Sequence, residues 1–191
     1  NKALGSTTDH TLTVNNTGAL TASAMAGSGL AAPFTFKGGS YPGTGGTCST
    51  ALAAAANCSI VITYAPTVLG AHTDTMVLNY NDGLTGQTAS RDLQGTGVTP
   101  ASLAISDGPT YDFGTKGIGS STDKTFTVSN SGGIAATSML GSGLAAPFTF
   151  KGGSYPGSGG TCGATLAAAA NCTMVVAYAP TATGLSADTI D

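Results

Sequence analysis

The chain has 191 residues, of which 41% are hydrophobic and only 8% are charged, against about 25% charged residues in an average soluble protein. Its six basic and nine acidic residues give a net charge of −3, which argues against nucleic-acid binding because that function needs clustered Lys and Arg. Glu is absent and Thr, Ser, Gly and Asn supply most polar positions, so the composition favours strands over helices.

An internal repeat organises the whole sequence. Residues 1–77 return as residues 115–191 without a gap, and 48 of the 77 aligned pairs are identical. Residues 27–43 recur letter for letter as residues 141–157. A period of 114 residues matches one autonomous domain better than a solenoid unit, which has about 20–50 residues. We therefore expect two tandem modules, residues 1–98 and residues 99–191.

Within the first module, alternating and β-branched segments predict strands. The expected strands are residues 10–15, 20–26, 58–64, 74–80 and 87–93. Residues 33–46 are so rich in Gly and Pro that we expect a compact loop without regular structure. Asn81-Asp82-Gly83 predicts the turn of a final hairpin, and residues 95–100 predict a short linker.

The second module repeats this plan with one addition at its start. Residues 103–105 alternate as a first strand, and residues 108–114 predict a turn and a short extended piece. Further strands are expected at residues 124–129, with Phe126 and Val128 facing inward, at residues 134–140 and after Cys172. About seven short strands per module, and no helical period, predict an all-β chain of two immunoglobulin-like antiparallel sandwiches.

Both modules are expected to be incomplete. Module 1 lacks a counterpart of the strand at residues 103–105, and module 2 lacks most of the final hairpin. Open strand edges and uncovered core would follow. Either the chain is a window of a longer array, or neighbouring chains supply the missing strands, as in pilus-like fibres.

The four cysteines fall at equivalent places, Cys48 and Cys58 in module 1 and Cys162 and Cys172 in module 2. Zinc sites usually pair cysteines two to four residues apart, so the nine-residue spacing favours a disulfide within each module. Such a bridge would stabilise a module by about 3 kcal/mol in the chain-entropy model. It also indicates an oxidising compartment, which predicts an extracellular or cell-surface protein.

The segment from Cys48 to Cys58, the β-branched strand that follows and its ending Tyr64-Ala-Pro-Thr resemble bacterial choice-of-anchor D modules. These belong to the immunoglobulin-like repeats related to the ASH (ASPM, SPD-2, hydin) domains. The resemblance covers essentially the whole chain. It implies tandem modules in large secreted or surface-anchored bacterial proteins, and it carries over no catalytic residue.

No pattern predicts chemistry. His10 and His72 become Lys124 and Ser186 in module 2, so neither is expected to be a catalytic base, and both are interpreted as exposed strand residues. No run of calcium ligands, no phosphate-binding loop and no nucleophile elbow is present, so we expect no catalytic residue, no metal and no cofactor. No apolar run approaches the roughly 20 residues that cross a bilayer, which argues against membrane insertion.

The identical segment, residues 27–43 and 141–157, is here called the Gly-rich segment, and it is the candidate contact loop. Either each module makes the same contact with it, or the duplication is recent, and the sequence leaves both explanations open. Its lysines are interpreted as lying over neighbouring aromatic rings, because no Asp partner for an isopeptide bond is evident. The candidate residues are Phe34, Phe36, Lys37 and Tyr41 in module 1, and Phe148, Phe150, Lys151 and Tyr155 in module 2.

The functional expectation is a non-enzymatic structural repeat protein of a bacterial extracellular or cell-surface fibre, stalk or scaffold. Assembly by strand complementation between chains is one form of it. The expected partners are copies of the chain or neighbouring modules. The alternative is an adhesin-type binding module, in which the Gly-rich and aromatic loop recognises a protein or a glycan.

Overall fold

The computed structural model describes residues 1–191 and contains thirteen β-strands and no helix. The chain divides into two compact units, Asn1–Thr99 (unit 1) and Pro100–Asp191 (unit 2). Each unit has its own cluster of buried apolar side chains. The expected class, an all-β chain of immunoglobulin-like sandwich modules, is confirmed.

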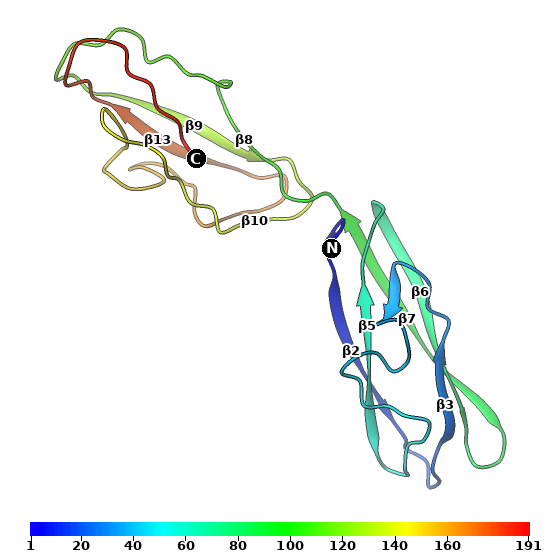
Figure 1. The fold of residues 1–191 in the computed structure, drawn as a ribbon. Helices are drawn as coiled ribbons and strands as arrows, with labels where there is room; N and C mark the ends of the chain where they lie inside the picture. The colour runs from blue at the N-terminus through cyan, green and yellow to red at the C-terminus, as the bar shows by residue number, and fades with distance from the viewer. The chain divides into compact units, whose positions relative to one another are not determined.

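Unit 1 is built from two sheets (Figure 1). One sheet has the order β1-β7-β6-β3, and its strands are Lys2–Ala3, Gly86–Val98, Gly70–Asn81 and Ser23–Ser28. The other has the order β2-β5-β4, and its strands are Thr8–Asn15, Asn57–Tyr64 and Phe34–Phe36. The outer edge of β2 therefore has no neighbouring strand.

The hairpin of β6 and β7 is the longest element of unit 1. Its turn forms where the sequence predicts it, because Asp82 Oδ1 accepts the amides of Leu84 and Thr85 at 2.8 Å each. The expected linker from residue 95 was wrong. Strand β7 runs on to Val98 because β6 pairs with it on one side and β1 pairs with its last residues on the other.

Unit 2 repeats the second sheet of unit 1 and adds a strand to it. The order is β11-β13-β9-β8, with strands Phe148–Phe150, Asn171–Tyr178, Thr122–Asn130 and Leu103–Ile105. Facing it are only β10 and β12, which are Ala136–Thr137 and Thr165–Leu166. The strand expected at residues 134–140 is thus reduced to two residues. Unit 2 has no equivalents of β6 and β7, as unit 1 has none of β8.

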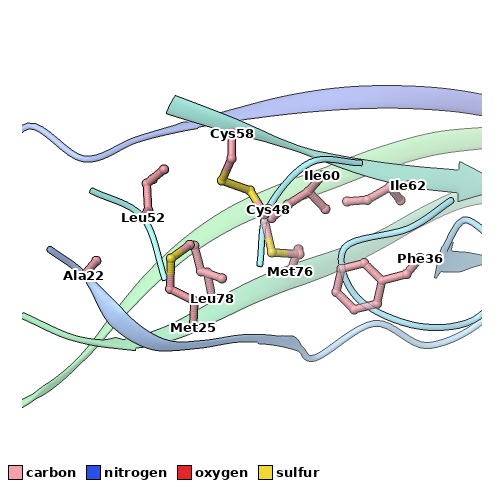
Figure 2. Close-up of a cluster of buried hydrophobic side chains, with 10 residues drawn as sticks. All are labelled: Ala22, Met25, Phe36, Cys48, Leu52, Cys58, Ile60, Ile62, Met76 and Leu78. Carbon is pink, nitrogen blue, oxygen red and sulfur yellow. A yellow bond between two sulfur atoms is a disulfide. The ribbon is translucent and has the colours of Figure 1, made fainter. Parts of the chain in front are cut away.

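The central strand of this shared sheet explains why both units form it. β5 and β13 alternate in burial and place β-branched or long apolar side chains inward, among them Ile60 and Met174, which are 0% and 2% exposed. In unit 1 the facing sheet contributes Met76 and Leu78. Figure 2 shows this core, with a disulfide lying among its apolar side chains.

Candidate interaction surfaces

The aromatic rings of the Gly-rich segment point into the protein. Phe34 and Phe36 are 3% and 8% exposed because they belong to β4, which pairs with β5. The expectation of a loop without regular structure was wrong at these residues. The Phe34 ring stacks on Tyr64 with ring centroids 4.7 Å apart, and Tyr41 meets Phe36 edge to face at 5.9 Å. Burial raises the pKa of Tyr41.

Unit 2 arranges its copy of the segment in the same way. Phe150 is buried and meets Tyr155 edge to face, with centroids 5.6 Å apart. Phe148 is half-buried and stacks on Tyr178 at 4.7 Å. Here Phe113 also contacts both rings of that stack, so the segment at residues 108–114 covers the core without forming a strand.

The backbone of the segment is fastened to β5, which gives the letter-for-letter identity a structural reason. The Lys37 amide donates to the Val61 carbonyl at 3.0 Å, and the Val61 amide donates to the Pro42 carbonyl at 2.8 Å. Gly43 is buried with φ of +89°, and a Cβ there would overlap the Val61 carbonyl oxygen. Only glycine suits that position.

Lys37 has a carboxylate partner that the sequence did not reveal. Its Nζ lies 2.8 Å from Asp9 Oδ2, and Thr63 Oγ1 donates to Asp9 Oδ1 at 2.6 Å. The hydrogen bonds from Lys37 and then Thr63 lower the pKa of Asp9. Lys151 repeats the ion pair with Asp123 at 2.7 Å. The interpretation of these lysines as lacking an Asp partner was therefore wrong.

Each unit contains one disulfide, between Cys48 and Cys58 in unit 1 and between Cys162 and Cys172 in unit 2. Both bonds lie within the buried cluster of their unit. Each bond connects a cysteine that follows the Gly-rich segment with the second residue of β5 or β13. No cysteine is free.

The two histidines differ in their surroundings. His10 is exposed on β2, as expected. His72 is half-buried, which corrects the expectation, because its Nδ1 hydrogen-bonds the Tyr64 hydroxyl at 2.8 Å and its ring lies 5.9 Å from that of Tyr64. The structure holds no group of three or more His, Cys, Asp or Glu side chains placed to bind a metal.

The sequence analysis did not identify one pair of equivalent residues, Asn16 and Asn130. Asn16 follows β2, and Asn130 is the last residue of β9. Each side-chain NH2 group lies within hydrogen-bond distance of three backbone carbonyls, which share its two hydrogens: Leu20, Leu52 and Ala53 around Asn16, and their equivalents Ile134, Leu166 and Ala167 around Asn130. All of these distances lie between 2.8 and 3.1 Å. The signal available in the sequence was their identity between the two copies.

The carbonyl oxygen of each Asn accepts the amide two residues later, from Gly18 or Gly132. In unit 2 it also accepts the amide of Ser102, at 3.1 Å, from the segment that leads into β8. The asparagine thus joins the strand, the turn and the facing segment in one network. The second candidate surface is the outer edge of β2 and β9, here called the Asn edge. It comprises residues 13–18 in unit 1 and residues 127–132 in unit 2.

The family comparison bears on unit 1. Residues 2–96 match the family described as HYDIN/CFA65/VesB-like, Ig-like domain. The match supports an immunoglobulin-like module of the hydin type in this part of the chain. The match agrees with the two-sheet arrangement and with the absence of helices in the structure.

Other comparisons add little. A crystal structure of a protein of unknown function from Porphyromonas gingivalis W83 is similar with a TM-score of 0.39 and 14% identity, over 94% of this chain and 78% of that chain. No curated protein matches the chain. No helix of the structure has the length and the apolar character needed to span a membrane.

Proposed function

We propose that the chain is a non-enzymatic structural part of a bacterial extracellular or cell-surface fibre, stalk or scaffold. The observation that carries the proposal is that the same sheet with its Gly-rich segment occurs twice, each time with its own buried core and its own disulfide. Repeated independent domains set the reach of a protein without requiring an active site. The resemblance to choice-of-anchor D repeats supports the same role.

The disulfides support the proposed location. Cytosolic glutathione and thioredoxin keep thiols reduced, so structural disulfides persist mainly in oxidising compartments. Here both bonds lie in the core, and no second role for the four cysteines is visible in their surroundings. They serve to hold the Gly-rich segment against the central strand of each sheet.

The experiment that tests the proposal combines surface labelling with thiol counting in the source bacterium. Intact cells are treated with an impermeant biotin reagent and a thiol-alkylating agent, with a cytosolic enzyme as the control. We expect the chain to be biotinylated without lysis and to be alkylated at cysteine only after reduction. A protein labelled only after lysis, with four reactive thiols, would contradict the proposal.

Assembly is tested separately on the purified chain. Light scattering and electron microscopy over a range of concentrations should show extended particles or higher oligomers if the chain itself forms the fibre. Monomers at all concentrations would show that the chain does not form a fibre by itself and would leave it as one part of a longer array.

A binding role is the second candidate, and one observation favours it. The residues at the tip of the Gly-rich segment, Gly38, Gly39 and Ser40, are exposed and recur unchanged in unit 2. Because the aromatic rings are buried or half-buried, a ligand would meet this tip and the lysine beside it. A glycan array and pull-down with the full chain, compared with the double variant Ser40→Lys/Ser154→Lys, should show binding that the two substitutions abolish. Equal signals from both proteins would exclude recognition by the tip.

A further inference from the structure

In unit 2 the Asn edge is covered by a short segment. Strand β8 pairs antiparallel with β9, placing Leu103 opposite Asn130 and Ile105 opposite Val128. The pairing is extended by the Ser131 amide, which donates to the Ser102 carbonyl at 2.9 Å, and by the Ser106 amide, which donates to the Thr127 carbonyl at 2.8 Å. Asn130 is 2% exposed beneath this segment.

The same receiving residues are present in unit 1, and no strand of this chain pairs with them. Val14, Asn16 and Gly18 match Val128, Asn130 and Gly132 in sequence. Val14 and Val128 pair with the equivalent cysteines of the central strands, and the Asn16 and Asn130 amides donate to the equivalent carbonyls of Ala56 and Ala170. Val14 and Asn16 are half-buried, whereas both counterparts are buried. The Asn16 side-chain oxygen accepts the Gly18 amide at 3.0 Å, and the place held by the Ser102 amide in unit 2 is open to solvent.

A cavity of about 570 Å³ opens beside this edge, between the two sheets of unit 1. Its walls include Val14, Asn16, Gly18, Leu20, Leu78 and Tyr80. Because opposite residues of a strand pair project from the same face of a sheet, Leu103 and Ile105 in β8 face the same side as Val128. In unit 2 these two side chains are 45% and 43% exposed, because no counterpart of β6 and β7 faces them. In unit 1 the facing sheet is present, so side chains at those positions on an added strand would enter the cavity beside Leu78.

The glycine shows how closely a covering segment approaches. Gly132 is buried, and a Cβ there would overlap the backbone of Pro100 and Ala101. Gly18 is exposed, and a Cβ there would meet only Asn16 Oδ1, at 3.3 Å. The position is therefore crowded in the covered unit and open in the uncovered one.

We propose that the Asn edge of unit 1 binds an extended, uncharged peptide strand with the sequence character of Pro100–Ser106, antiparallel to β2. Its leucine lies opposite Asn16 and its isoleucine opposite Val14. Main-chain hydrogen bonds to β2 supply affinity, and the two apolar side chains filling the cavity supply specificity. This inference depends on the proposed structural function at one point only, because it takes another module to be the natural source of the peptide strand.

The test titrates a capped synthetic peptide, Thr99–Ser106 (TPASLAIS), into the isotope-labelled full chain. Calorimetry measures the affinity, and nuclear magnetic resonance locates the site. We expect saturable binding with one peptide per chain, with shifts at Thr13, Asn15 and the Asn16 side-chain amide. A control peptide with Asp in place of the leucine and the isoleucine should bind at least tenfold more weakly.

A matched variant on the protein separates this site from non-specific edge binding. Gly18→Ala should leave the thermal unfolding of the chain nearly unchanged, because its Cβ meets no backbone in unit 1. It should weaken peptide binding at least tenfold, because the same Cβ stands where the backbone of the peptide passes.

Three outcomes would overturn the proposal: no binding at millimolar peptide, equal binding by Gly18→Ala, or shifts confined to unit 2. Concentration-dependent dimers that pair β2 with β2, and that the peptide does not dissociate, would assign the edge to a second copy instead. These results are independent of the surface-labelling experiment, so a failure of this inference and a failure of the proposed function are distinguishable.

Discussion

Units 1 and 2 keep the same sheet and differ in what covers it. In unit 1 the sheet β2-β5-β4 faces a second sheet of four strands, but its outer edge is open. In unit 2 the equivalent sheet gains β8 at that edge and faces only two short strands. The Gly-rich segment, the disulfide, the Lys–Asp pair and the asparagine network are present in both.

The difference teaches which parts of the module depend on one another. The asparagine makes the same three carbonyl contacts whether or not the covering segment is present. The segment adds burial and one more hydrogen bond, from Ser102. The edge in unit 1 is therefore already formed before a strand binds to it. Preformed sites bind with less loss of conformational entropy.

The largest expected effect comes from truncating the central strand in each unit. Ile60→Ala should lower the free energy of unfolding of unit 1 by about 3–4 kcal/mol, because it removes a fully buried side chain packed between two sheets. Met174→Ala should lower that of unit 2 by less, about 2–3 kcal/mol, since the thinner cover of unit 2 can relax into the cavity. Urea unfolding followed by resonances of each unit measures both. A larger loss of unfolding free energy in unit 2 than in unit 1 would contradict the view that the core of unit 2 has the thinner cover.

Removing a disulfide should come next. The double substitution Cys48→Ala/Cys58→Ala should destabilise unit 1 by about 2.5–3 kcal/mol, as the chain-entropy model gives for a ring of about ten residues. Unit 2, with its own bond intact, should be unchanged, and Cys162→Ala/Cys172→Ala should give the reverse pattern. Thermal unfolding with unit-specific resonances checks this. Loss of both units from one double substitution would show that they do not fold independently.

The asparagine network distinguishes the units more finely. Asn130→Ala should cost about 2–3 kcal/mol, because it leaves buried carbonyls and two amides without partners. Asn16→Ala should cost about 1 kcal/mol, since water can reach the groups that it releases. The measurement is urea unfolding of each variant. Equal losses of stability from the two substitutions would mean that water does not reach the Asn edge of unit 1.

The smallest expected effect is the acid dependence of the Lys–Asp pair. The folded pKa of Asp9 is lowered below the ordinary aspartate value of about 3.9, so the pair stabilises unit 1 above that pH. This contribution is lost as the pH falls through the folded pKa. Lys37→Met should raise the pKa of Asp9 and make the stability of unit 1 less steep in pH between about pH 4 and pH 2. A titration of Asp9 by nuclear magnetic resonance, with Lys151→Met as the control in unit 2, tests this. An unchanged titration of Asp9 in Lys37→Met would contradict it.

The sequence predicted the parts of the fold that local patterns encode. Alternation placed the strand at residues 124–129 within β9, and the Asn-Asp-Gly turn placed the hairpin. The buried strand β4 was missed because it has three residues within a run dominated by Gly and Pro. Local composition cannot show that Phe34 and Phe36 pair with a strand more than 20 residues later.

The candidate surfaces were harder to predict for the same reason. Asn16 contacts carbonyls 36 and 37 residues away, and Lys37 pairs with Asp9 across a sheet. Neither relation has a fixed spacing that a sequence reader could use. The copy-to-copy identity of these residues was visible, but identity alone does not separate a structural network from a binding site.

Amide hydrogen exchange of the full chain, without added peptide, tests the central claim most directly. Odd-numbered residues of β9 point their amides toward β8: the Thr127 amide donates to Ser106 Oγ at 3.0 Å, and Ser129 pairs with Ala104. Their equivalents Thr13 and Asn15 on β2 face an edge without a neighbouring strand. We expect slow exchange at Thr127 and Ser129 and fast exchange at Thr13 and Asn15. Equal protection of the two pairs would show that the edge of unit 1 is already covered, and the account would be wrong.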